Sequence, residues 1–147
     1  QTKKGFSASV ESFYQGSKVF EKGGPYKDLY TCSSLDSKKD SRLKSSGELI
    51  GFKFEATKWG LNDHFYDWLY LNALLQNKEI SDQILSYDAF TDIEFNPKKS
   101  YNCQAYSAAL YKAALLRKYN LKEIKDPRAF KELFPREQLL NFQLELF

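Results

Sequence analysis

Glu11, Gln15 and Lys18 combine the side-chain types needed to move protons and to attack an electrophilic carbon. They are separated by four and three residues, so a helix through all three would present a carboxylate, an amide and an amine on one face. If that face borders a pocket, partial burial would lower the pKa of Lys18, while Glu11 could carry protons to and from a leaving group. The alternative is a solvated polar face, because the Glu-to-Lys spacing is too long for a direct ion pair. Spacing alone favours the solvated face.

The apolar pattern predicts the elements that would position these side chains. We expect a helix over residues 9–20, where apolar side chains return every three or four residues, and a largely buried helix over residues 65–75. Alternation predicts a strand from Leu49 to Glu55, with Ile50, Phe52 and Phe54 on one side. Further helices are expected at residues 33–45, 79–87, 100–119 and 126–134, and further strands at residues 91–95 and 141–147. The fold class is therefore α+β and rich in helix, with a small β-sheet.

The composition indicates one folded domain over residues 1–147. Of the 147 residues, 42% are hydrophobic and 16% aromatic, which is enough for a packed core. No stretch approaches a membrane-spanning length and no secretory signal is apparent, so we expect a cytoplasmic protein with no membrane association. Cys32 and Cys103 are far apart, which fits a reducing compartment, and His64 has no partners at metal-ligand spacing, so no metal is predicted. The net charge of +3 permits contact with phosphate groups but falls short of the strong basic bias of many DNA-binding domains.

Residues 9–20 (SVESFYQGSKVF) resemble the signature of the NADAR (YbiA-like) family, in which a Val-Glu pair precedes an aromatic-Gln couple and a Lys. The likeness continues in four further runs: residues 23–26 (GGPY), 42–47 (RLKSSG), 65–70 (FYDWLY) and 87–100 (YDAFTDIEFNPKKS). In these stretches the chain looks most like the branch encoded beside DarT-type toxins, which ADP-ribosylate guanine in DNA. The resemblance covers roughly residues 5–115.

This resemblance implies a YbiA-like single domain and an antitoxin that removes ADP-ribose from guanine bases in DNA, thereby reversing the toxin's modification. By analogy with the family, Lys18 is the nucleophile that forms a Schiff base with the distal ribose, and Glu11 is the acid and base. No cofactor is implied. The implied partners are ADP-ribosylated DNA or ADP-ribose, with the cognate DarT-type toxin as the functional partner. Family members carry a strand and a loop before the Val-Glu pair, so we expect the N-terminal part of the family fold to be missing.

Seven residues are predicted to bind the substrate: Gln15, Gly23, Gly24, Tyr26, Trp59, Asp92 and Asn102. The two glycines could bring backbone N–H groups close to a pyrophosphate, although glycines that end helices are common for structural reasons. Tyr26 and Trp59 could stack on a base, yet most aromatic residues in so aromatic a chain belong to the core. Asp92 could bind ribose hydroxyls, with a solvated strand face as its alternative. Asn102 lies where YbiA-like relatives carry an Asp-x-x-Trp-Gly run.

Two other functions fit the same motif. A YbiA-like N-glycosidase would act on phosphorylated ribosylamine intermediates of riboflavin synthesis. A non-catalytic ADP-ribose-binding module would use Glu11 and Lys18 only to hold the ligand, with Lys18 as the partner of a phosphate or carboxylate.

Overall fold

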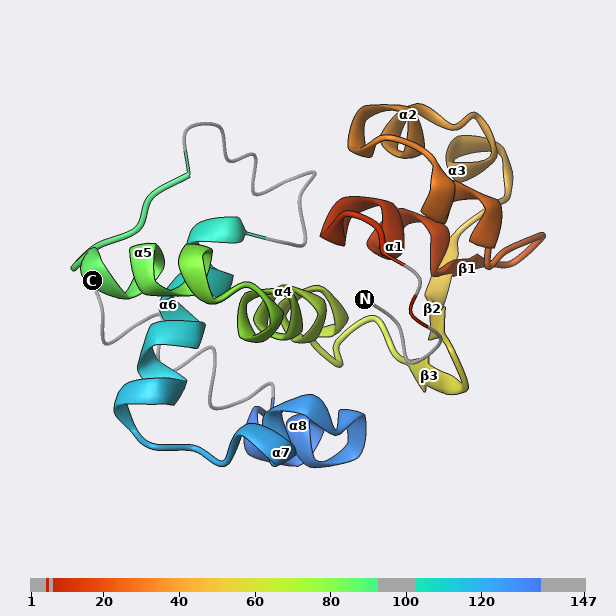
Figure 1. Ribbon diagram of the computed structural model, residues 1–147. Helices are drawn as coiled ribbons and strands as arrows, with labels where there is room; N and C mark the ends of the chain where they lie inside the picture. The colour runs from red at the N-terminus through yellow and green to blue at the C-terminus, as the bar shows by residue number, and fades with distance from the viewer. Residues whose placement is uncertain (1–4, 6, 93–102, 136–147) are drawn as a thin grey trace. The chain divides into compact units, whose positions relative to one another are not determined.

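A computed structural model describes residue 5, residues 7–92 and residues 103–135 (Figure 1). The chain divides into two compact units, one formed by Gln1–Phe65 with Phe134–Phe147 and the other by Tyr66–Leu133. The first unit holds the sheet and the Glu11 motif, and the second is helical in its described part. The fold class is the helix-rich α+β expected from the sequence.

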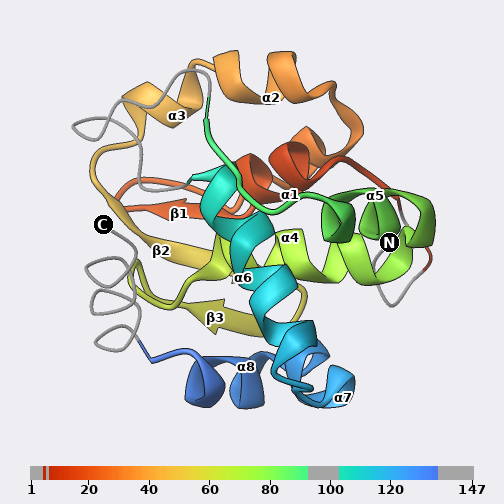
Figure 2. The ribbon, with the colours of Figure 1, turned by 90° about the vertical axis from the view of Figure 1, so that its left-hand side faces the viewer.

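A three-stranded antiparallel sheet in the order β1-β2-β3 forms one side of the first unit (Figure 2). Its strands are β1 (Lys18–Phe20), β2 (Leu49–Phe54) and β3 (Thr57–Trp59). The strand predicted from Leu49 to Glu55 is confirmed as β2, which turns into β3 through Glu55 and Ala56. Alternation did not reveal β3, because a strand of three residues is too short to display a period of two.

A bulge in β2 corrects the predicted orientation of Ile50. Val19 pairs with Gly51 but Phe20 pairs with Leu49, so Ile50 is the extra residue of the longer strand. A bulge of this kind re-aims the side chain of the residue it inserts. Phe52 and Phe54 are buried as predicted, whereas Ile50 is 57% exposed.

The helix predicted over residues 9–20 is shorter than expected. Helix α1 is Val10–Gly16, and β1 begins at Lys18, so the prediction that Lys18 lies on the same helix as Glu11 is wrong. The backbone of Lys18 to Phe20 pairs with β2, and this tertiary pairing overrides the helical period of the sequence. Gly16 ends the helix where a Cβ atom would lie 2.6 Å from ring carbons of Tyr30, so the chain passes closer to that ring than any other residue would allow.

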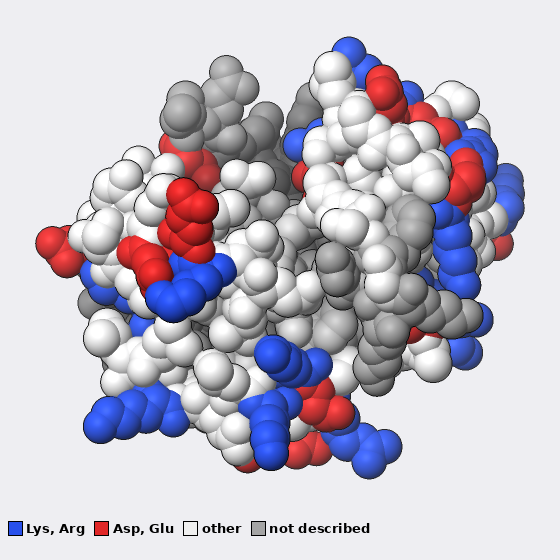
Figure 3. Space-filling view, viewed as in Figure 1, with Lys and Arg blue, Asp and Glu red and all other residues white. Residues whose placement is uncertain are grey.

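The rest of the first unit consists of short helices: the 3-10 helix η1 (Lys27–Thr31), α2 (Ser34–Lys39) and α3 (Arg42–Ser45). Both η1 and α2 pack against α1. The single helix predicted over residues 33–45 is therefore two, because Asp40 takes a non-helical conformation between them. Figure 3 shows both acidic and basic side chains on the face in view, in keeping with the small net charge of +3.

The second unit contains most of α4 (Phe65–Gln76) together with α5 (Lys78–Ser86), α6 (Gln104–Leu116), α7 (Leu121–Lys125) and α8 (Pro127–Leu133). The buried helix predicted over residues 65–75 is confirmed as α4, with Trp68, Leu71 and Leu74 among its buried residues. The hydroxyl of Ser107 on α6 donates to Asp67 on α4 at 2.6 Å. Asp126 caps α8 by accepting from the backbone N–H of Ala129 at 2.8 Å, as its position before Pro127 predicts.

Two predicted strands fall largely on residues that the structure does not describe. Thr91 and Asp92 are not in a strand, and the remainder of the run at residues 91–95 lies outside the described residues, as does the predicted strand at residues 141–147. Among the described residues no helix is long and apolar enough to cross a membrane.

Candidate active site

The start of α1 is fixed by a chain of serine hydroxyls. The side chain of Ser9 caps the helix by accepting from the backbone N–H of Ser12 at 3.0 Å, and it also accepts from the hydroxyl of Ser34 at 2.8 Å. The hydroxyl of Ser12, which is fully buried, donates to the carbonyl of Cys32 at 2.9 Å. These bonds tie the first turn of α1, and with it Glu11, to α2 and the segment before it.

Glu11 and Gln15 form a direct hydrogen bond one helical turn apart. Nε2 of Gln15 donates to Oε1 of Glu11 at 2.6 Å. The side chain of Glu11 is 16% exposed, and its other oxygen lies 3.7 Å from Nζ of Lys38 on α2. Gln15 is buried, and its Oε1 has no hydrogen-bond partner within the described part of the chain. The carboxylate is thus held between a buried amide and a surface amine.

Lys18 reaches the same neighbourhood from the first position of β1. Its Nζ lies 5.1 Å from the centre of the Tyr14 ring, a cation–π distance. Burial lowers the pKa of the Lys18 amine, the negative charge of Glu11 partly opposes this, and the positive charge of Lys38 adds to it. Gln15 is bonded to Glu11, and the charge of Glu11 acts on Lys18, although a strand rather than the predicted helix supplies the lysine.

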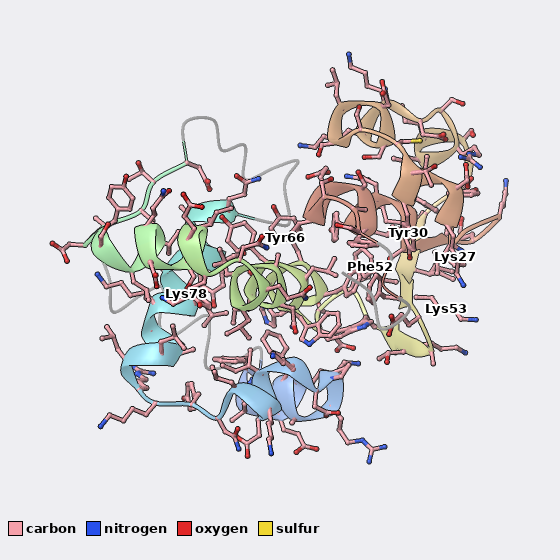
Figure 4. All side chains as sticks on the ribbon, in the orientation of Figure 1. Lys27, Tyr30, Phe52, Lys53, Tyr66 and Lys78 are labelled. Atoms are coloured by element: carbon pink, nitrogen blue, oxygen red, sulfur yellow. The ribbon has the colours of Figure 1, made fainter. Side chains whose placement is uncertain are left out.

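Aromatic packing holds Tyr14 in place beneath the amine. The Tyr14 ring lies 5.1 Å from that of Phe52 and 6.1 Å from that of Phe65, measured between ring centres. Figure 4 shows that Phe52 and Lys53, neighbours on β2, point to opposite sides of the strand. Lys18 pairs with Phe52 across the sheet, so its side chain belongs to the Phe52 side, where α1 packs.

The backbone of Lys18 is fixed on both sides. The carbonyl of Ser17, the residue before it, accepts from the backbone N–H of Lys53 at 2.8 Å. The buried hydroxyl of Ser17 shares a hydrogen bond of 2.9 Å with the hydroxyl of Tyr30. Gly24 has φ of 86° and sits so close to the Lys18 carbonyl oxygen that a Cβ atom would overlap it. Gly24 thus packs against the strand that carries the lysine.

A family model described as "DarT1-associated NADAR antitoxin" matches residues 1–143, which is nearly the whole chain. The chain belongs to this NADAR family. No curated protein matches the sequence. The family's name associates its members with a DarT1 toxin, and the match spans both units of this NADAR chain.

Gly23 and Tyr26, which were also predicted to bind the substrate, follow the Phe20 end of β1. Gly23 forms an isolated antiparallel bridge with Phe20. The hydroxyl of Tyr26 is hydrogen-bonded to that of Ser46. The Arg42 guanidinium covers the Tyr26 ring, with its Cζ 4.5 Å from the ring centre. Arg42 is also paired with two carboxylates, those of Asp28 and Asp40.

Trp59 lies in the core, the alternative that the sequence left open for it, and Asp92 takes a position that the sequence did not predict. Trp59 is only 2% exposed and lies 5.3 Å from the Phe65 ring, so the structure does not place it where a base could stack. Asp92 belongs to the second unit, where it accepts from the thiol of Cys103 at 2.5 Å and from the backbone N–H of Ala105 at 3.1 Å. It thereby caps α6, and burial together with this bond raises the pKa of the Cys103 thiol. Asn102 lies outside the described residues.

Lys38 lies near Glu11 and Tyr14 lies near Lys18, but the sequence did not predict either of them as a site residue. Lys38 approaches Glu11 from another helix, and no spacing in the sequence relates the two residues. Tyr14 is one of the apolar side chains that recur along the first helix, and at 6% exposed it also belongs to the core. No group of three or more His, Cys, Asp or Glu side chains able to hold a metal ion occurs within residues 7–92 and 103–135.

Proposed function

We propose that this chain is an N-glycosidase that removes ADP-ribose from guanine bases in DNA, with Lys18 as the nucleophile and Glu11 as the proton carrier. The observation that carries this proposal is the amine of the half-buried Lys18, which lies over the Tyr14 ring and has a pKa lowered by burial, a shift that the charge of Glu11 partly opposes. An amine with a lowered pKa is neutral for a larger fraction of the time than a surface lysine, and only the neutral amine is a nucleophile. Membership of the DarT1-associated NADAR antitoxins supports the choice of ADP-ribosylated DNA as substrate.

The reaction begins with opening of the distal ribose: the bond between C1 and the ring oxygen breaks, the oxygen takes up a proton from water, and C1 becomes an iminium carbon bonded to the guanine nitrogen, which keeps its hydrogen. The neutral Lys18 amine adds its lone pair to C1, and one of its protons passes to the Glu11 carboxylate. Glu11 then gives this proton to the guanine nitrogen, which leaves with the electron pair of its bond to C1. C1 is now a Schiff base with Lys18. Addition of water to C1 breaks the bond to Lys18, restores the amine and releases ADP-ribose.

The test is release of ADP-ribose from DNA that carries ADP-ribosylated guanine. We expect the wild-type protein to release it and Lys18→Ala to lose activity by at least about a hundredfold, since a nucleophile cannot be replaced by a methyl group. Lys53→Ala is the matched control, because Lys53 is exposed and lies on the other face of the sheet. Borohydride added during turnover should attach the sugar to Lys18, which peptide mass spectrometry would locate.

Three results would contradict the proposal in different ways. If Lys18→Ala releases ADP-ribose at the wild-type rate, then Lys18 is not the nucleophile. Faster cleavage of a phosphorylated ribosylamine than of modified DNA would favour a small-molecule N-glycosidase. Tight binding of ADP-ribose without turnover or a trapped adduct would indicate a binding module in which Glu11 and Lys18 only hold the ligand.

A further inference from the structure

The side-chain amide of Gln15 is buried, and only its nitrogen forms a hydrogen bond within the described residues. Nε2 donates to Glu11, Gln15 is 6% exposed, and Oε1 is buried without a hydrogen-bond partner among the residues that the structure describes. An ionised carboxylate accepts hydrogen bonds but cannot donate one, so the bond to Glu11 decides which end of the amide faces the carboxylate. The carbonyl oxygen therefore points away from Glu11 and keeps its accepting capacity.

A buried carbonyl of this kind calls for a donor. Buried polar atoms nearly always find a partner in folded proteins, and an exception calls for an explanation, of which a role in catalysis is one. An amide oxygen can accept only from an O–H or N–H group. Glu11 keeps 16% of its side chain exposed, so a ligand that reaches this carboxylate is within one hydrogen bond of the Gln15 amide.

We propose that Oε1 of Gln15 accepts a hydrogen bond from the sugar hydroxyl next to the carbon that Lys18 attacks, and so fixes the distal ribose relative to the amine. This inference rests on the proposed function. A sugar whose anomeric carbon meets Lys18 and whose leaving nitrogen meets Glu11 carries its 2-hydroxyl on the carbon bonded to the reacting carbon. Donors on the base belong to the group that departs, whereas this hydroxyl stays with the sugar in substrate, Schiff base and product. The bond should therefore appear in the binding of free ADP-ribose.

The experiment removes the two partners of this bond separately. ADP-ribose, and an ADP-ribose that lacks the 2-hydroxyl of its distal ribose, are titrated by calorimetry into the wild-type protein and into Gln15→Met. Gln83→Met is the matched control, because Gln83 is an exposed amide on α5. We expect the wild-type protein and Gln83→Met to bind ADP-ribose about five- to tenfold more tightly than the deoxy compound. Gln15→Met should bind the two compounds with equal affinity.

Equal binding of the two compounds by the wild-type protein would overturn the inference, whether or not Gln15→Met folds. A Gln15→Met protein that still prefers ADP-ribose would overturn it as well. The inference would also be overturned if Gln15→Met bound both compounds as the wild-type protein does and lost only the hydrolysis of modified DNA. The Gln15 carbonyl would then act on the base. Hydrolysis assays on the same wild-type protein separate the two proposals: turnover with equal binding refutes only the hydroxyl contact, whereas a protein that neither binds ADP-ribose nor releases it from DNA refutes both.

Discussion

Lys18 lies with its Nζ 5.1 Å from the centre of the Tyr14 ring, although the two residues belong to different elements, a strand and a helix. The ring gives the amine a surface that favours positive charge, while burial disfavours it. Phe52 and Phe65 hold the ring from the other directions. The position of the amine therefore depends on the aromatic core as well as on Glu11.

Replacing the Tyr14 ring should displace the Lys18 amine. We expect Tyr14→Leu to lose roughly 1–3 kcal/mol of folding stability, through lost aromatic packing, and to reduce kcat more than it changes KM. Tyr14→Phe keeps the ring and should keep most of the activity. Thermal unfolding and steady-state hydrolysis of ADP-ribosylated DNA would measure both effects. A Tyr14→Leu protein with wild-type kcat would mean that the ring does not position the amine.

Lys38 should tune the reactivity of Lys18 through charge. Its positive charge lowers the pKa of Lys18, so Lys38→Ala should raise that pKa and reduce the neutral amine present at a given pH. If the neutral amine attacks the sugar, the rising limb of the pH–rate profile should move to higher pH. The neighbouring Lys39→Ala, an exposed change on the same helix, should leave the profile in place. This role would be refuted if the rising limb of the Lys38→Ala pH–rate profile stayed at the wild-type pH or moved to lower pH.

Gly24 should be required for the position of β1. In Gly24→Ala the new residue must adopt φ of 86°, and its Cβ must displace the carbonyl of Lys18. We expect a loss of about 1–3 kcal/mol in folding stability and a fall in kcat, because the strand that carries the nucleophile has to shift. Gly60→Ala is the matched control, since its Cβ would meet nothing closer than Asp63 at 3.5 Å. Chemical denaturation of both variants would decide whether Gly24 acts through the backbone of Lys18.

The sequence predicted which residues gather at the site better than it predicted the elements that bring them there. Glu11 and Gln15 lie one helical turn apart, and local periodicity suffices to relate them. Lys18 appeared to continue the same face, but its backbone pairs with β2, a partner some thirty residues away that no local pattern reveals. The approach of Lys38 to Glu11 depends on the packing of α2 against α1 and could not be predicted for the same reason.

The roles of the aromatic residues were the hardest to predict, because the same residue types stack on bases and fill the core. Trp59 was predicted to stack on a base, but it is the last residue of the short strand β3 and lies in the core, where its ring packs against that of Phe65. The Ile50 error has a similar origin. Alternation in β2 is interrupted by a bulge, which is a property of the pairing between two strands and not of either sequence alone.

Removing the charge of the half-buried Lys18 side chain should stabilise the folded protein. Its pKa is lower in the folded than in the unfolded chain, where the ordinary value is 10.5. Between the lowered pKa and 10.5 the unfolded chain binds more protons, so stability rises with pH across that interval, and below it the full cost of burying the charge remains. Lys18→Met should therefore unfold at a higher temperature than the wild-type protein at pH 7, and the difference should shrink as the pH approaches 10.5. Lys53→Met, which changes an exposed lysine, should show no such pH-dependent difference. A Lys18→Met protein less stable than wild type at pH 7 would mean that contacts of the ammonium group outweigh its burial, and the amine would then be a poor nucleophile.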